Sequence, residues 1–321
     1  MTSNQLSTAP LPNKTSGLSD AANRVALRRF QIGAIALFLA FALPLWNLFR
    51  LALKTEIQSH ILLIPFIVAY LWKTSPKPQP HETKSSHASS IVAGLFGVLA
   101  TIGYWLLRKG GNIAQSDALS LSTAAFLLFL LALSLATLGW GCLRPRLFAI
   151  SFAVFLIPLP HLLTATLSVW LQNASAEAAD IMISLIGMPF NRDGMSFQFA
   201  GLAIRVAEEC SGMRSTFVLF ITSLIAGHMF LHTGWKKALL ALSIFPVGIL
   251  RNGFRITTIS WLSVNVDAGI IDGPLHHHGG PLFFLLSLLP LFVLLWFLRR
   301  SDSFRNRSQA PLHKKSQQCE D

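Results

Sequence analysis

Hydrophobic residues fall in long runs along most of the chain, and charged residues lie mainly between these runs. A helix that crosses a membrane needs roughly 20 apolar residues, and runs of about that length recur with few charges inside them. Helices satisfy their own backbone in lipid, and the runs do not alternate as barrel strands do. The expected fold is therefore all-α, a polytopic transmembrane helix bundle of about eight spans, at residues 31–49, 59–72, 91–107, 119–141, 147–167, 214–233, 238–262 and 281–298.

Both ends of the chain lack this pattern. Residues 1–30 are rich in Ser, Thr, Asn and Pro, which predicts a disordered cytoplasmic tail. Residues 299–321 are basic and predict a second cytoplasmic tail, so the membrane domain is expected at 31–298. The polar start leads directly into a long apolar run, which favours a first span over a cleavable signal peptide.

Composition and charge agree with a membrane protein. Of the 321 residues 52% are hydrophobic and only 12% are charged, which argues against a water-soluble fold. The net charge of +12 comes from short clusters that flank the apolar runs, so these clusters act as topology signals and no nucleic-acid partner is expected. With eight spans, most basic residues lie on the side of both termini, as the positive-inside rule requires. The pattern predicts a multi-pass protein of the cell inner membrane.

The stretch between the fifth and sixth spans is too polar for a membrane interior. The charged and amide side chains of residues 168–213 include Glu177, Asp180, Asn191, Arg192, Asp193, Arg205, Glu208 and Glu209. Residues 168–187 suit an interfacial amphipathic helix. The sequence MSFQFAGLAIRVAEEC alternates in part around a glycine, which predicts a small extracytoplasmic hairpin or extended segment before the sixth span.

Cys210 is the cysteine that the predicted topology isolates. Cys142 and Cys319 are expected on the cytoplasmic side, where neither can form a disulfide with it. An unpaired cysteine is often a small buried hydrophobe, and this remains one interpretation. The alternative is a reactive thiol, because Cys210 lies just before the sixth span, where a helix start favours the thiolate. Ser211 has no obvious base beside it, and Gly212 suits a tight turn or a close helix contact.

The segment Arg251-Asn252-Gly253-Phe254-Arg255 places two cations and an amide in an otherwise apolar seventh span. Such residues are costly in lipid and are expected to face the protein interior or a water-filled cavity. Arg251 and Arg255 are four residues apart and share one helix face. In the alternative interpretation these arginines reach the membrane interface or hold a structural carboxylate.

Three consecutive histidines, His276, His277 and His278, precede the eighth span. Adjacent residues seldom point at one ion, and Asp272 is the one acidic residue near them in sequence, so neither a metal nor any other cofactor is expected. A histidine that acts as general acid or base is the simpler hypothesis, because its usual pKa lies near neutral pH. The sequence leaves open which of the three would serve.

The predicted topology brings the three groups to one membrane face. The sixth span begins, the seventh ends and the eighth begins on the non-cytoplasmic side, and short connections make the three helices antiparallel neighbours. A thiol, a guanidinium and an imidazole in one pocket suit acyl transfer by a cysteine nucleophile.

The three motifs together resemble the signature of the exosortase/archaeosortase family. They are Cys210-Ser211-Gly212, Asn252-x-x-Arg255 and His276-x-x-x-Gly280-x-x-x-Phe284, each beside a hydrophobic span. The span layout is similar over residues 35–298, and the specific part is 201–298. The resemblance implies a membrane thiol protease and transpeptidase for protein sorting, with catalytic Cys210, Arg255 and His276. Arg251, Asn252, Ser211, Gly212, His277 and His278 are possible supporting residues.

The resemblance also implies the partners. Substrates would be membrane-anchored proteins that end in a short motif, a transmembrane helix and a basic cluster, and the cleaved protein would pass to a cell-surface acceptor. The sequence leaves the motif, the acceptor and the oligomeric state open. Two other hypotheses are a transporter for polysaccharide export, in which the arginines and histidines line a polar path, and a non-catalytic scaffold of such a system.

Overall fold

The structure is a computed structural model, and it describes residues 14–76, 87–111, 114–199, 202–206, 212–267, 269–270 and 280–317. The chain divides into two compact units, residues 1–161 and residues 162–321. Within the described residues, six helices are long and apolar enough to cross a membrane. The number rises to eight if each of two bent helix pairs counts as one span. The predicted all-α polytopic bundle is confirmed.

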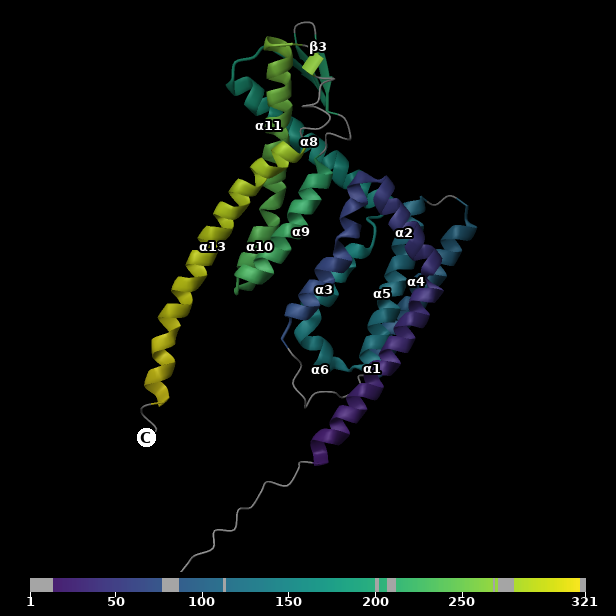
Figure 1. Cartoon of the computed structure of the whole chain (residues 1–321). Coiled ribbons are helices and arrows are strands. Elements are labelled where there is room, and N and C mark those ends of the chain that lie inside the picture. The colour runs from purple at the N-terminus through teal and green to yellow at the C-terminus, as the bar shows by residue number, and fades with distance from the viewer. Residues whose placement is uncertain are drawn as a thin grey trace, which may run out of the picture. The chain divides into compact units, whose positions relative to one another are not determined.

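The first unit is a set of helices around the long hairpin of α4 and α5 (Figure 1). A Cβ atom on Gly97 of α4 would lie 3.0 Å from the ring of Phe129 on α5, so the two helices approach closely there. The Ser90 hydroxyl donates a hydrogen bond to the Ala132 carbonyl over 2.8 Å, which joins them at the other end. The elements in order are α1 (Lys14–Ala40), α2 (Ala42–Lys54), η1 (Glu56–Leu62), α3 (Ile64–Thr74), α4 (His87–Lys109), α5 (Gln115–Thr137), α6 (Trp140–Leu143), η2 (Arg144–Arg146), α7 (Leu147–Phe152) and η3 (Ala153–Leu156).

Two predicted spans are broken helices. The first, expected as one helix over 31–49, bends by 67° between α1 and α2. Pro44 has no N–H to bond the Ala40 carbonyl and its ring crowds that carbonyl, so the bend falls at Phe41. The fifth, expected over 147–167, is interrupted at 157–160, where Pro158 and Pro160 lie.

After the break at residues 157–160 the chain forms one long helix, where the sequence predicted two elements. The helix α8 runs without interruption over His161–Leu185, so the end of the fifth span and the separate interfacial helix expected at 168–187 are one helix. Helix α1 begins at Lys14, within the predicted tail 1–30, and the last helix continues to Gln317, within the predicted basic tail 299–321.

The second unit contains the remaining elements, which are α8, β1 (Asn191–Asp193), β2 (Ser196–Phe199), β3 (Leu202–Arg205), α9 (Met213–Phe230), α10 (Gly234–Leu242), α11 (Ile244–Asn265) and α13 (Gly280–Gln317). Helix α9, the end-to-end pair of α10 and α11, and α13 lie side by side (Figure 1). Their apolar core includes Leu219, Leu240, Ile244 and Leu291, all at most 1% exposed. The predicted seventh span is the pair α10 and α11, which meet at Ser243.

The predicted hairpin or extended segment is present as strands β2 and β3, which pair antiparallel with Phe197 opposite Ile204. A further strand, β1, pairs with β2 and was not expected from the sequence. Gly194 occupies the first position of the two-residue β1–β2 turn with φ +58°, a conformation that glycine adopts without strain.

Candidate active site

The predicted site residues divide into those that the structure describes and those that it does not. Cys210, Ser211, His276, His277 and His278 lie outside the described residues. Gly212 and the whole of helix α11, with Arg251, Asn252 and Arg255, are described. All of these positions belong to the second unit.

Gly212 ends the first motif and caps helix α9 in a left-handed conformation with φ +68°. Its carbonyl oxygen accepts three hydrogen bonds, from Thr216 N at 2.9 Å, Ser215 Oγ at 3.0 Å and Arg251 Nη2 at 3.3 Å. A Cβ atom here would lie 2.7 Å from Arg251 Nη2 and 3.3 Å from Asn252 Cγ. The position therefore requires glycine for its backbone angle and for the space beside α11.

Glycines on α11 bring this helix close to its neighbours. A Cβ atom on Gly248 would lie 2.6 Å from Thr216 Oγ1 of α9, and one on Gly253 would lie 2.8 Å from Ala178 Cβ of α8. The two contacts flank Arg251 and Asn252, and they hold this part of α11 against α9 on one side and α8 on the other. The structure thus places the end of the first motif directly against the second motif.

The polar side chains of α11 point into the protein. Arg251 is 7% exposed and Asn252 is 1% exposed, whereas Arg255 is half-buried. Among the described residues, Arg251 Nη1 has no hydrogen-bond partner, and the same holds for the buried hydroxyls of Thr257, Ser260 and Ser263. Thr257, Ser260 and Ser263 lie on a different face of α11 from Arg251, so buried polar groups face the protein on more than one side of this helix.

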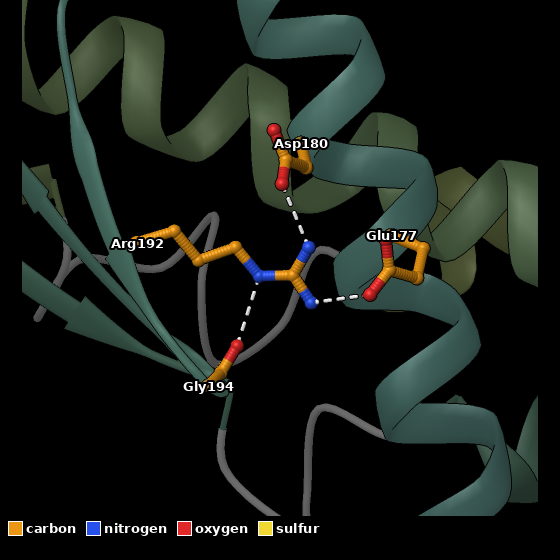
Figure 2. A network of polar contacts seen from close by, with 4 residues as sticks. All are labelled: Glu177, Asp180, Arg192 and Gly194. Carbon is orange, nitrogen blue, oxygen red and sulfur yellow. Dashed lines mark hydrogen bonds and ion pairs between the residues drawn. The ribbon is translucent and has the colours of Figure 1, made fainter.

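The small sheet is fastened to α8 by an ion cluster that the sequence did not reveal. Figure 2 shows the Arg192 guanidinium between α8 and the β1–β2 turn. Its Nη2 atom lies 2.8 Å from Glu177 Oε1, its Nη1 atom 2.7 Å from Asp180 Oδ2, and its Nε atom donates to the Gly194 carbonyl. The hydrogen bonds to Glu177 and Asp180 raise the pKa of Arg192 above its usual range. The cluster was visible in sequence only as charges that could not lie in hydrocarbon.

An apolar cluster beneath the sheet joins it to two helices. Phe197 of β2 and Ile183 of α8 are fully buried, and Ile256 of α11 packs in the same cluster. Val206, 3% exposed, also belongs to it and directly precedes residues 207–211. The chain therefore enters residues 207–211 from a position, Val206, that the apolar core holds in place.

A buried ion pair between α10 and α13 was also not predicted from the sequence. Lys236 Nζ lies 2.6 Å from Asp302 Oδ1, and the two residues are 2% and 5% exposed. Asp302 further accepts hydrogen bonds from Thr233 Oγ1 and the His232 backbone N–H at the start of α10. In the sequence Lys236 is one of the basic residues that flank the apolar runs, and its partner lies 66 residues away.

Comparison with known proteins agrees with the motifs. A family model described as transmembrane exosortase matches residues 46–293, which is well over half of the chain. No curated protein and no solved structure matches the chain. Within the described residues, His, Cys, Asp and Glu side chains form no group of three or more that could hold a metal ion.

Proposed function

Since this chain belongs to the transmembrane exosortase family, we propose that it cleaves a C-terminal sorting signal of exported proteins and transfers them to a surface acceptor. Family membership carries the general role, that of a membrane transpeptidase in protein sorting. The observation that most supports the finer proposal is the contact of Gly212 with Arg251 and Asn252. It joins the motif that contains Cys210 to the motif that contains Arg255.

Cys210 is the proposed nucleophile. It lies two residues before the N-cap of α9, where the unpaired N–H groups of a helix start favour a thiolate. The thiolate attacks the scissile carbonyl, and the tetrahedral intermediate collapses to a thioester as the C–N bond breaks. His276, or one of its neighbours His277 and His278, protonates the leaving amine.

The second half of the reaction regenerates the thiol. The same histidine takes a proton from the acceptor nucleophile, which attacks the thioester carbonyl and releases Cys210 as the thiolate. Arg255 steadies the negative oxygen of each tetrahedral intermediate. Arg251 and Asn252 are proposed as positioning residues, since their contacts are with the Gly212 turn that follows the nucleophile.

The reaction is placed on the non-cytoplasmic face of the cell inner membrane. Exported substrates reach that face, and the positive-inside pattern assigns to it the start of α9 and the end of α11. Substrates would dock laterally from the lipid bilayer by a C-terminal transmembrane helix, with the cleavage motif outside and the basic cluster inside.

Replacement of the thiol tests the proposal. Cys210→Ala and Cys210→Ser should each stop cleavage of a membrane-anchored substrate at unchanged protein abundance. Cys142→Ser is the matched control, because Cys142 contacts Arg146 in the first unit and has no part in the proposed reaction. Full cleavage by Cys210→Ala would remove the catalytic assignment. Labelling of Cys210 by a thiol probe from outside the cell also separates the enzyme from a transporter or a scaffold.

A further inference from the structure

Strand β3 has one edge that no described strand covers. The sheet order is β1-β2-β3, so β3 (Leu202–Arg205) pairs with β2 on one side only. An uncovered edge presents backbone N–H and C=O groups that can pair with an extended peptide. This edge strand leads along the chain into the segment that contains Cys210.

The register identifies the backbone groups at this edge. Val206 N donates to Met195 O over 2.9 Å, which makes these two residues a hydrogen-bonded pair. Because hydrogen-bonded and non-hydrogen-bonded pairs alternate in an antiparallel ladder, Ile204 and Leu202 also bond to β2. The N–H and C=O groups of Ala203 and Arg205 therefore point away from β2, toward the edge that no described strand covers.

The edge is held in position before anything binds. Leu202 and Ile204 pack on the apolar cluster below the sheet, and Arg192 fastens β1 to α8 through Glu177 and Asp180. Ala203 and Arg205 have exposed side chains, and the methyl group of Ala203 leaves room for a chain alongside. A preorganised edge lowers the entropy cost of binding a peptide.

The edge is also within reach of the proposed nucleophile. Arg205 precedes Cys210 by five residues, and a fully extended chain of that length spans at most about 18 Å. Two outward-pointing residues offer pairing to a segment of about four or five residues, the size of a short cleavage motif. The occupant must be extended to expose its scissile bond, which is the conformation that strand pairing requires.

We propose that the edge of β3 opposite β2 binds the cleavage motif of the substrate as an added strand, through the backbone of Ala203 and Arg205. The inference rests on the proposed function, because it names how the same site holds its substrate. A second copy of this chain suits the edge less well. Two copies paired antiparallel would bring their exposed Arg205 side chains near each other, and like charges across strands are unfavourable.

Disulfide trapping tests the pairing without any need for catalysis. The full-length chain carries Cys142→Ser, Cys210→Ala and Cys319→Ser, together with either Ala203→Cys or Arg205→Cys. The partner is a membrane-anchored reporter that ends in the C-terminal segment of an exported protein cleaved by the parent chain, with one cysteine moved through its motif. Cross-links should form at alternate reporter positions, and the pattern should shift by two residues between the two variants. Uniform or absent cross-links to the reporter, or cross-links to a second copy instead, would overturn the proposal.

A proline substitution tests the same edge in the active chain. Proline removes an N–H, and at an edge position whose N–H points outward it leaves the β2–β3 ladder intact. Ala203→Pro should reduce reporter cleavage at least about tenfold at an unchanged melting temperature, as expected for a lost hydrogen bond and a steric clash. Ala203→Ser keeps the N–H at almost the same side-chain size, so its cleavage rate should be well above that of Ala203→Pro.

The outcomes separate this inference from the proposed function. If Ala203→Pro cleaves as the parent does while Cys210→Ala does not, the strand edge is the wrong binding site and the cysteine chemistry stands. If Cys210→Ala still cleaves, the proposed function fails. The cross-link pattern then still tests whether the β3 edge binds the substrate. If Ala203→Pro lowers the melting temperature, the cross-link pattern alone tests whether the β3 edge binds the substrate.

Discussion

Arg251 Nη2 lies 3.3 Å from the carbonyl oxygen of Gly212 and donates a hydrogen bond to it, which joins α11 to the first turn of α9. Gly212 follows Cys210 by two residues, and Arg251 precedes Arg255 by one helical turn. This hydrogen bond therefore links the segment that is proposed to hold the nucleophile, Cys210, to the helix that carries Arg255, which is proposed to bind the oxyanion.

A methyl group at Gly212 should disrupt this link. Gly212→Ala must adopt φ +68° and place its Cβ 2.7 Å from Arg251 Nη2, so we expect a loss of about 1–3 kcal/mol in unfolding free energy and a severe loss of cleavage. Thermal unfolding in detergent and a cleavage assay measure the two effects. Gly234→Ala, at the start of α10 in open space, is the control and should change neither quantity appreciably.

Removal of the Arg251 charge should affect the thiol as well as the fold. Arg251→Met takes a cation away from the turn after Cys210, which disfavours the thiolate and should shift the labelling of Cys210 by a thiol probe toward higher pH. Arg251→Lys keeps the charge but not the planar donor geometry, so its labelling curve should lie between that of the Arg251→Met variant and that of the parent. Identical curves for all three proteins would remove Arg251 from the positioning role.

The ion cluster at Arg192 predicts a ranking of substitutions. Arg192→Met should loosen the sheet and destabilise it by about 1 kcal/mol, a modest value because the cluster is partly solvent-exposed. Asp180→Asn should have a larger effect than Glu177→Gln, since the side chain of Asp180 is 33% exposed and that of Glu177 is 68% exposed. Hydrogen exchange of the β1–β2 hairpin measures this order, and the reverse order would contradict the burial argument.

The Lys236–Asp302 pair should contribute strongly to stability because both groups are buried. Lys236→Met leaves the carboxylate without its cation and should cost about 3 kcal/mol. The double variant Lys236→Met with Asp302→Asn should be more stable than Lys236→Met alone, because the uncompensated charge is gone. Lys237→Met, at the adjacent and more exposed position, is the control. A melting temperature for Lys236→Met equal to that of the control would show that the pair is not buried in the protein.

Much of the bundle was predictable because its cause is local. A run of about 20 apolar residues is a span whatever surrounds it, and an alternating segment around a glycine is a hairpin candidate. The breaks at Phe41 and at residues 157–160 are also local, since prolines lie beside both, but hydropathy alone does not register them.

The candidate site was predictable to a lesser degree. The motifs marked Gly212, Asn252 and Arg255 by their residue types and spacing, and the structure places Gly212 against Asn252. The family match confirms the family that the motifs resemble. The roles of Cys210, Arg255 and His276 remain predictions, and Cys210 and His276 also lie outside the described parts of the chain.

The amino-acid sequence by itself determined the class of this protein, because insertion into a membrane depends on summed hydrophobicity and charge along one segment. Only the tertiary structure decided which polar groups meet, such as Arg192 with Asp180, Lys236 with Asp302, and Arg251 with Gly212. These partners lie 12, 66 and 39 residues apart, and helix packing rather than any local pattern brings them together.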